Sequence, residues 1–517
     1  MASKALRYVC LSDMHLGAAY STLTDVDAQG RPDPTRPSGT LVAFGDALRR
    51  LISTLGDGTP PTLILMGDVL DMGLSPMGSV AAAFRCFVEA VMLDETCKPV
   101  FAPRVLCVPG NHDHHLWRMA QDQHFHEALY QGRIDHDLIE HTALFEDAGE
   151  PDTPRVDAPM LTRLMSGYPA LAGAHADIAY PNLGLLDKFR RRCVVLHHGH
   201  YIDPIYRLMS SLNAQAPGLA ATRNRGPLTV AELETQNGAW VDFMWSDLGS
   251  SGLTGTRAGT LYELSLDAGA SHDFSQRLAE MVVARLDQSF GMSGSMPVVQ
   301  GVTVKQLVTG VLDATLGRAA ESQRGGYLDV MSDADVEDLS WYLSGAVKLQ
   351  LERAKLKPSE LDLTFVFGHT HKPFEDELPV PGFDRPVSVF NTGGWVMDQP
   401  TMSSMQGAAA VFIDEAMNVA SLRLFNDPVN GSIAPVKARG VGGFRDRSNP
   451  MLAALAAGIE RTAPAWELFS RSAQKATESR ATRLLDEFFS ASVEVIKQAQ
   501  EEMKAKEQVG ARAKVRA

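Results

Sequence analysis

Residues 104–113, RVLCVPGNHD, pass from a short apolar run into a turn of glycine, asparagine, histidine and aspartate. A run of this length, rich in β-branched residues and bounded by glycine, is typical of a buried strand. Helical patterns such as 41–55 and 79–93 separate several runs of this kind, and this alternation predicts an α/β fold with ligands bound beyond the carboxyl ends of the strands. Four more stretches share the design: 6–15 (LRYVCLSDMH), 61–71 (PTLILMGDVLD), 192–200 (RCVVLHHGH) and 363–371 (LTFVFGHTH).

The composition is that of a globular protein with an acidic balance. The chain has 517 residues, of which 45% are hydrophobic and 21% charged. The formal net charge of −14 counts against a surface that coats nucleic acid. The five cysteines lack metal-type spacing, so we expect free thiols in a reducing compartment. The sequence has neither a signal-peptide pattern nor an apolar run long enough to span a membrane, which predicts a cytoplasmic protein without a transmembrane segment.

The strand-like runs are unevenly spaced, and the long intervals indicate insertions. The interval after residue 200 is too long for a structureless loop, and Thr229 and Glu232 in it have the spacing of a capping box. Near the carboxyl terminus an apolar helical face is expected, made of Leu484, Leu485, Phe488, Phe489, Val493 and Ile496. The predicted units are a first part of the core at 1–200 with a loop-rich insertion at 114–192, a helical insertion or lid at 201–350, a second part of the core at 351–435, and a helical extension at 436–517.

Each of the five strand ends carries side chains suited to metal ions. Taken singly, an aspartate at such a place often caps a helix and an asparagine often occupies a left-handed turn. Five strands that all end in such groups at one edge favour a metal centre instead. Imidazoles, carboxylates and an amide without thiolates suit Mn²⁺, Fe²⁺ or Zn²⁺. The candidates are Asp13 and His15; Asp68 and Asp71; Asn111, His112 and Asp113; His197, His198 and His200; and His369 and His371.

In order along the chain, the motifs Asp-x-His, Gly-Asp-x-x-Asp, Gly-Asn-His-Asp, His and Gly-His-x-His resemble those of the calcineurin-like metallophosphoesterase superfamily. The resemblance implies a four-layer α/β/β/α sandwich and a site for two divalent metal ions. It also implies that His112 protonates the leaving group, that Asp113 holds the ring of His112, and that Asp71 lies behind the ligands. The ligands it implies are Asp13, His15 and His371 for the first ion, Asn111, His198 and His369 for the second, and Asp68 between the two.

The fourth block offers three histidines where the resemblance requires one ligand. We favour His198, which is followed by glycine and a polar residue as in the UDP-2,3-diacylglucosamine pyrophosphatase-like branch of the superfamily. His197 is the alternative, and His200 is either a substrate contact or a turn residue. The stretch VFNTGGW at 389–395 also resembles that branch.

The insertion offers candidate substrate contacts. In a lipid-precursor pyrophosphatase its aromatic residues would form an acyl-binding lid, whereas the simpler interpretation is that they form a core. The residues concerned are Trp240, Phe243, Met244 and Trp245, together with Arg207, Arg223 and Arg225, which are either contacts for a charged head group or surface charges.

The function that we expect is hydrolysis of a phosphoester or pyrophosphate bond in a phosphorylated substrate. The attacking group would be a hydroxide that bridges two divalent metal ions, with Mn²⁺ expected first and Fe or Zn as alternatives. A nuclease-type phosphodiesterase, a lipid-precursor pyrophosphatase and a non-catalytic interaction scaffold are the competing interpretations. The acidic balance counts against a nucleic-acid partner, and the complete set of ligands counts against a scaffold.

Overall fold

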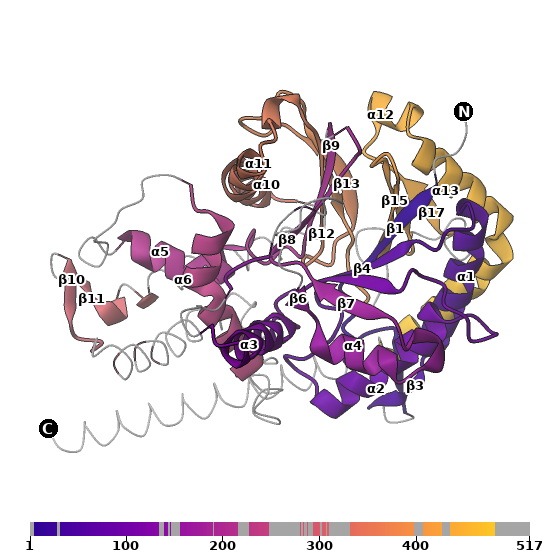
Figure 1. Ribbon diagram of the computed structural model, residues 1–517, viewed down its shortest axis with the longest axis horizontal. Coiled ribbons are helices and arrows are strands. Elements are labelled where there is room, and N and C mark those ends of the chain that lie inside the picture. Colours follow the sequence, from indigo (N-terminus) through magenta and orange to yellow (C-terminus); the bar gives the residue numbers. More distant parts are fainter. Residues whose placement is uncertain are drawn as a thin grey trace, which may run out of the picture.

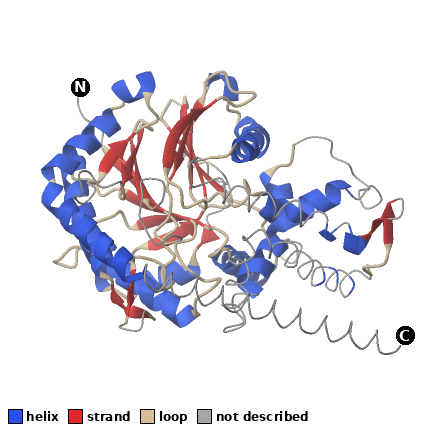
Figure 2. Ribbon diagram, turned by 180° about the vertical axis from the view of Figure 1, so that it is seen from behind, coloured by secondary structure: helices blue, strands red, loops and turns tan. Residues whose placement is uncertain are grey.

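The computed structural model describes most of the chain and shows two β-sheets stacked face to face with helices outside them (Figures 1 and 2). Together the helices and the two sheets form an α/β/β/α sandwich, and the predicted α/β fold with a helical region near its carboxyl end is confirmed. The described residues are 5–27, 31–133, 139–142, 145, 156–189, 191–215, 227–247, 280, 283, 287, 293–299, 302–306, 308–309, 331–397, 407–426 and 435–480.

The larger sheet has eight strands in the order β17-β16-β15-β1-β4-β5-β7-β6. Its centre is parallel and its two margins are antiparallel. The parallel strands are β1 (Leu6–Leu11), β4 (Thr62–Met66), β5 (Arg104–Val108) and β7 (His175–Ile178), and the others are β6 (Val156–Asp157), β15 (Ala409–Asp414), β16 (Val419–Arg423) and β17 (Lys437–Arg439).

The smaller sheet has five strands in the order β13-β14-β12-β9-β8. Its three inner strands are parallel and its edge strands are antiparallel to them. The five strands predicted from their polar ends therefore divide between the two sheets, three in the larger and two in the smaller. The strands are β8 (Asn182–Leu186), β9 (Arg192–His197), β12 (Asp362–Phe367), β13 (Phe374–Leu378) and β14 (Val387–Asn391).

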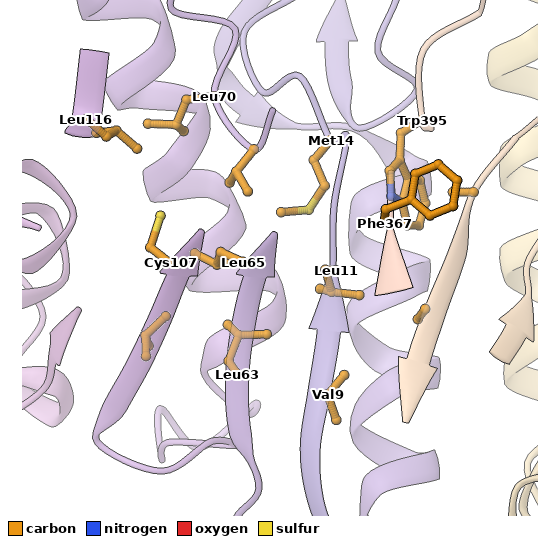
Figure 3. Close-up of a cluster of buried hydrophobic side chains, with 14 of the residues drawn as sticks. Val9, Leu11, Met14, Leu63, Leu65, Leu70, Cys107, Leu116, Phe367 and Trp395 are labelled. Atoms are coloured by element: carbon orange, nitrogen blue, oxygen red, sulfur yellow. The ribbon is translucent and has the colours of Figure 1, made fainter. Parts of the chain in front are cut away.

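Alternate residues of each central strand face two different cores, which explains why the strands are apolar throughout. Cys10, Ile64 and Leu106 of the larger sheet pack between the sheets against Leu196 and Val366 of the smaller one. Their neighbours Val9, Leu11, Leu63, Leu65 and Cys107 belong to the second core, together with Met14, Leu70 and Leu116 from beyond the strand ends (Figure 3).

Helices cover the outer face of each sheet. On the larger sheet α1 (Gly39–Leu55) buries Leu41, Phe44, Leu48, Leu51 and Leu55, whose spacing of three and four residues makes one apolar face. On the smaller sheet, Tyr342 at the end of α10 (Asp333–Tyr342) lies 6.2 Å from Phe365 of β12, ring centroid to ring centroid. Other elements are α2 (Met77–Phe87), α13 (Pro450–Arg461), α11 (Lys348–Arg353), α12 (Gly443–Arg447), β2 (Thr24–Val26), β3 (Pro32–Pro37), the π-helical turns η1 (Val88–Met92) and η5 (Leu343–Val347), and the 3₁₀ turn η6 (Pro358–Glu360).

The segment 114–192 differs from the loop-rich insertion that the sequence predicted. It supplies β6, β7 and β8, and so contributes strands to both sheets. The strand signal is weak because β7 contains His175 and Asp177, the latter paired with Arg104, and β8 contains Asn182 and a glycine. Its other elements are α3 (His115–Tyr130), α4 (Pro159–Ser166) and the 3₁₀ turn η2 (Pro169–Leu171).

The described parts of 201–350 are mainly helical. The capping box expected at Thr229 and Glu232 is present at the start of α6 (Val230–Asp242). No described helix has the length and apolarity that crossing a membrane requires. The other elements are the 3₁₀ turn η3 (Pro204–Arg207), α5 (Leu208–Gln215), the π-helical turn η4 (Phe243–Asp247), β10 (Pro297–Val299) and β11 (Val302–Thr303).

After α13, residues 463–480 form a further helix, and Trp466 and Phe469 of this helix pack against Phe44 of α1. The apolar face predicted between Leu484 and Ile496 lies outside the described residues, as do Arg223 and Arg225.

Candidate metal centre

Three of the predicted ligands form one compact group at the ends of β1 and β12. Asp13, His15 and His371 each present a ligand atom, and these atoms lie within 4.8 Å of one another. Nε2 of His371 is 3.7 Å from Oδ1 of Asp13 and 3.3 Å from Nε2 of His15. Two imidazole nitrogens and a carboxylate thus face one point. A cation would stabilise this arrangement.

A second group lies beside the first and includes Asp68, His198 and His369. Nε2 of His198 is 3.2 Å from Oδ2 of Asp68 and 2.9 Å from Oδ1 of Asn111. The same Asn111 oxygen is 3.0 Å from Nδ1 of His369. Since Oδ2 of Asp68 also lies 3.8 Å from Nε2 of His15, one carboxylate oxygen adjoins imidazoles of both groups.

The backbone at the strand ends takes a conformation that most residues avoid. Asp13, His15, Asp68, His369 and His371 have φ between 44° and 71° and are five of the eight non-glycine residues with positive φ in the described part of the chain. This left-handed region costs an L-residue roughly 1–2 kcal/mol. Hydrogen bonds between the loops hold it, among them Asp13 N to Gly67 O at 2.9 Å and His15 N to Asp68 O at 2.8 Å.

Two glycines let the strand ends approach one another. A Cβ atom on Gly110 would lie 2.3 Å from Oδ1 of Asp68, and one on Gly368 would lie 2.0 Å from Oδ2 of Asp13. Both distances are below any real contact of a Cβ atom. The glycines that precede Asn111 and His369 in the motifs are therefore required by the close packing around the ligands.

The buried charges at the centre fit a bound cation. Asp13 and Asp68 are buried, and Oδ2 of Asp13 has no hydrogen-bond partner within the described residues. Burial, together with the neighbouring Asp68, raises the pKa of Asp13, although His371 and two hydrogen bonds act in the opposite direction. A buried carboxylate oxygen without a partner is costly unless a cation compensates it. With its imidazoles, carboxylates and amide oxygen, the donor set suits divalent ions of intermediate hardness.

The structure separates the three histidines of the fourth block. His198 lies in the centre, as expected. His197 is the last residue of β9 and faces the opposite side, where its ring lies 4.9 Å from that of Tyr342. Nε2 of His200 is 3.3 Å from the hydroxyl of Tyr180, and its ring lies 5.8 Å from that of His198 but outside the ligand groups. The alternation of side chains along a strand accounts for the separation of His197 from His198.

The expected contact between Asp113 and the ring of His112 is wrong. The carboxylate of Asp113 accepts hydrogen bonds from the backbone N–H groups of Gly110 at 2.7 Å, Asp68 at 3.2 Å, Val69 at 2.9 Å and Leu70 at 3.3 Å. It thus joins the loops after β4 and β5. Adjacent side chains in this turn point in different directions, so the neighbour of His112 in the sequence is not its neighbour in space.

Asp71 is the residue that holds the ring of His112. Its Oδ1 lies 3.1 Å from Nδ1 of His112 and 3.6 Å from Nδ1 of His15. Burial disfavours a charge on His112, but Asp68 and Asp71 outweigh it and raise the pKa of the ring above its usual value. A histidine held in its protonated form is suited to donating a proton to a leaving group.

The insertion contributes to the centre through residues that the sequence did not indicate. Trp245 of η4 lies against His112 with ring centroids 3.8 Å apart. Tyr206 lies 5.4 Å from His369, ring to ring, and Oδ2 of Asp203 is 3.4 Å from Nε2 of His369. The sequence marked Trp245 only as part of an aromatic cluster, and no spacing rule links it to a histidine more than a hundred residues away.

The other candidates in the insertion have structural contacts. Arg207 pairs with Asp338 at 2.6 Å and lies over the ring of Trp341. Trp240 is buried, and its Nε1 donates to the carbonyl of Ile205 at 2.9 Å. Phe243 stacks near Trp240, and Phe243 and Met244 are partly buried against the same core. The described contacts of Arg207 and Trp240 stabilise the folded helices of the insertion, as the simpler interpretation of these residues expects.

Comparison with known proteins gives one family. Residues 6–218 match the family model of the calcineurin-like phosphoesterases. No curated protein matches the chain. The matched segment contains every predicted ligand from Asp13 to His198, and the fold brings His369 and His371 to the same centre from beyond it. Residues 6–218 are therefore a calcineurin-like phosphoesterase domain, and this domain indicates a hydrolase that acts on phosphoester bonds.

Proposed function

We propose that the enzyme hydrolyses its phosphoester with two divalent metal ions, Mn²⁺ by preference, and with His112 as the proton donor to the leaving group. The observation that carries the proposal is the position of Asp68, whose Oδ2 adjoins an imidazole of each ligand group, with His112 beside both. Asp13, His15 and His371 would hold one ion, and Asn111, His198 and His369 the other.

When bound, the ions would activate a water molecule and neutralise charge on the phosphoryl oxygens. The anionic Asp68 between the two groups would reduce the repulsion between two cations. The backbone N–H of His112 donates to Oδ1 of Asp68 at 2.8 Å and so fixes the carboxylate. The absence of thiolates among the ligands supports Mn²⁺ over a structural zinc ion.

His112 would transfer a proton to the departing oxygen. Its Nδ1 faces Asp71, so the proton for the leaving group would come from Nε2. Asp71 orients the ring and favours its protonated form. The donor supplies the proton that an alkoxide leaving group needs, a contribution of about 10²–10⁴ in rate for general acids.

The test is metal-dependent hydrolysis of bis-p-nitrophenyl phosphate and p-nitrophenyl phosphate. Metal-stripped protein is reconstituted with Mn²⁺ and compared with Asp68→Ala and His112→Ala. We expect turnover that requires the ion and falls by orders of magnitude in Asp68→Ala. The loss in His112→Ala should be smaller on these esters, because p-nitrophenolate departs readily without a proton. The ratio between the two substrates distinguishes a diesterase from a monoesterase.

His126→Ala is the matched control, because His126 is exposed on α3 away from the ligands. It should keep wild-type turnover. If the protein bound Mn²⁺ but Asp68→Ala hydrolysed both esters as well as the wild type, the proposed site would be wrong.

A further inference from the structure

We propose that Trp245 is a positioning residue for His112, so that the helical insertion is a working part of the active site. The inference rests on the proposed function, because it assigns a consequence to the role of His112 as proton donor. Three observations carry it: the contact of Trp245 with the ring of His112, the restraints on the indole itself, and the buried junction that holds the insertion in place.

The contact fixes His112 on a side that Asp71 leaves open. Asp71 bonds one edge of the imidazole through Nδ1, and a single bond of this kind still allows the ring to swing about that edge. The indole of Trp245 lies against the face of the ring, with centroids 3.8 Å apart and planes inclined by 35°. Edge and face contacts together restrain the ring of His112, which also lies 4.6 Å from the ring of His15.

The indole is itself restrained. Its Nε1 donates to the hydroxyl of Tyr206 at 2.9 Å, and the side chain is 7% exposed. A Cβ atom on Gly73 would lie 3.0 Å from Cε3 of Trp245 and 3.7 Å from Nδ1 of His112. The loop after β4 therefore packs against the indole with no space for a side chain. An aromatic ring restrained in this way can hold the ring of His112 in position.

A buried carboxylate joins the insertion to the segment that carries His112. Glu234 of α6 accepts hydrogen bonds from Nε1 of Trp117 at 3.0 Å and from the hydroxyls of Tyr180 at 3.0 Å and Tyr201 at 2.5 Å. Trp117 lies in α3, which begins three residues after His112. The loop and helix that present the imidazole thus also bind the helix that leads to Trp245.

A second contact of the junction lies one turn before Trp245. Nδ1 of His114 is 2.6 Å from Oδ1 of Asp242, the last residue of α6. His114 is 1% exposed and Glu234 is 7% exposed, whereas the side chain of Asp242 is 21% exposed, so the contacts of Glu234 are the better shielded from water. Polar contacts in the first half of α6 and at its last residue therefore set the position of Trp245 relative to His112.

The experiment measures how strongly turnover depends on the leaving group. p-Nitrophenolate leaves readily without a proton, whereas phenolate is a poorer leaving group and requires the proton donor. Diphenyl phosphate and bis-p-nitrophenyl phosphate are compared at saturating Mn²⁺ for the wild type, His112→Ala, Trp245→Ala and Trp245→Phe. We expect Trp245→Ala to lower kcat for the phenyl ester about tenfold more than for the p-nitrophenyl ester, with KM little changed and two Mn²⁺ ions retained.

Trp245→Phe keeps an aromatic face and should restore most of the loss. Tyr206→Phe removes only the hydroxyl that accepts from the indole, so it should give a smaller loss in the same sense and serves as the second variant if Trp245→Ala folds poorly. Trp341→Phe is the control, because Trp341 also lies in the insertion but packs on Arg207. Its ratio of phenyl to p-nitrophenyl turnover should equal that of the wild type.

The outcomes separate this inference from the proposed function. If His112→Ala shows the leaving-group dependence and Trp245→Ala, Trp245→Phe and Tyr206→Phe do not, Trp245 is not a positioning residue. An equal loss of turnover on both esters in the Trp245 variants also overturns the inference, since it would mean general damage. If His112→Ala itself lacks the dependence, the role of His112 is wrong and both proposals fall.

Discussion

Gly110→Ala is a substitution that adds one methyl group at the point where the two ligand groups meet. Its Cβ would lie 2.3 Å from Oδ1 of Asp68, 2.7 Å from the backbone N of Asp68 and 2.8 Å from Cδ2 of His198. The φ of Gly110 is not in the left-handed region, so alanine meets no backbone strain of its own. The expected effect is therefore a displacement of Asp68 and His198.

The size of the displacement follows from the contact distances. Real Cβ atoms essentially never approach another heavy atom closer than 3.0 Å, so Oδ1 of Asp68 must move by about 0.7 Å. A shift of this order in a catalytic group costs about 10²-fold in rate. Overpacking in a closely packed site destabilises a fold by about 1–3 kcal/mol. We expect a loss of turnover of about 10²-fold and a weaker binding of at least one ion.

The assay combines calorimetric titration with Mn²⁺, kcat on bis-p-nitrophenyl phosphate, and urea unfolding. Gly78→Ala is the matched control, because Gly78 lies in α2 and a Cβ atom there meets nothing within 4 Å. Alanine at this helical position should raise the free energy of unfolding by about 0.5–1 kcal/mol and leave turnover unchanged. Wild-type affinity for two ions together with wild-type kcat in Gly110→Ala would refute the placement of Asp68 in the site.

Four further predictions concern the buried charges and the binding of Mn²⁺. Asp68 and Asp71 both raise the pKa of His112, and Asp71→Asn removes the second of these charges, so the alkaline limit of kcat should move to lower pH in a pH–rate profile. An unmoved limit would exclude Asp71 as the partner of His112. Burial opposes a charge on His114, but Asp242 and Glu234 raise its pKa to about 10, above the unfolded value of 6.5. The resulting stability is complete below pH 6.5 and is lost as pH rises through 10, so urea unfolding should show this loss in the wild type and a smaller one in His114→Gln. The pKa of Asp13 is raised in the metal-free protein, so Mn²⁺ binding near neutral pH should release protons, and the calorimetric enthalpy should vary with the ionisation enthalpy of the buffer. Mn²⁺ at 100 times its Kd should also add about 2.7 kcal/mol to the free energy of unfolding, whereas a metal-independent melting curve would count against the site.

Local sequence patterns predicted the central strands and the residues that gather at their ends. Each of these strands is buried on both faces, so its apolar run is long enough to recognise. The edge and marginal strands could not be predicted in the same way. β7 carries the ion pair of Asp177 with Arg104, and β8 begins with Asn182, whose amide bonds Gln350 at 2.6 Å. Tertiary contacts stabilise these strands where the local pattern does not indicate them.

The contacts around the ligands were less predictable than the ligands themselves. Asp113 and Asp71 are both three or fewer residues from a ligand position, and only the directions of their side chains decide which one reaches His112. Trp245 contacts the same histidine because α6 docks against α3. This docking depends on the bond between Glu234 of α6 and Trp117 of α3, which are more than a hundred residues apart in the sequence. A motif gives the residue types and their order, but side-chain direction and docking arise from the whole fold.

The left-handed conformation of five candidate ligands indicates what the strand ends are built for. At roughly 1–2 kcal/mol each, these residues together cost several kcal/mol, an amount comparable with the net stability of a whole domain. Glycine in place of Asp13 or His371 would remove the backbone strain, and an apolar residue in place of an aspartate would remove the buried charge. Neither change would leave a donor at the centre. The chain retains both costs where the two sheets meet, and the proposed binding of cations by these donors would offset them.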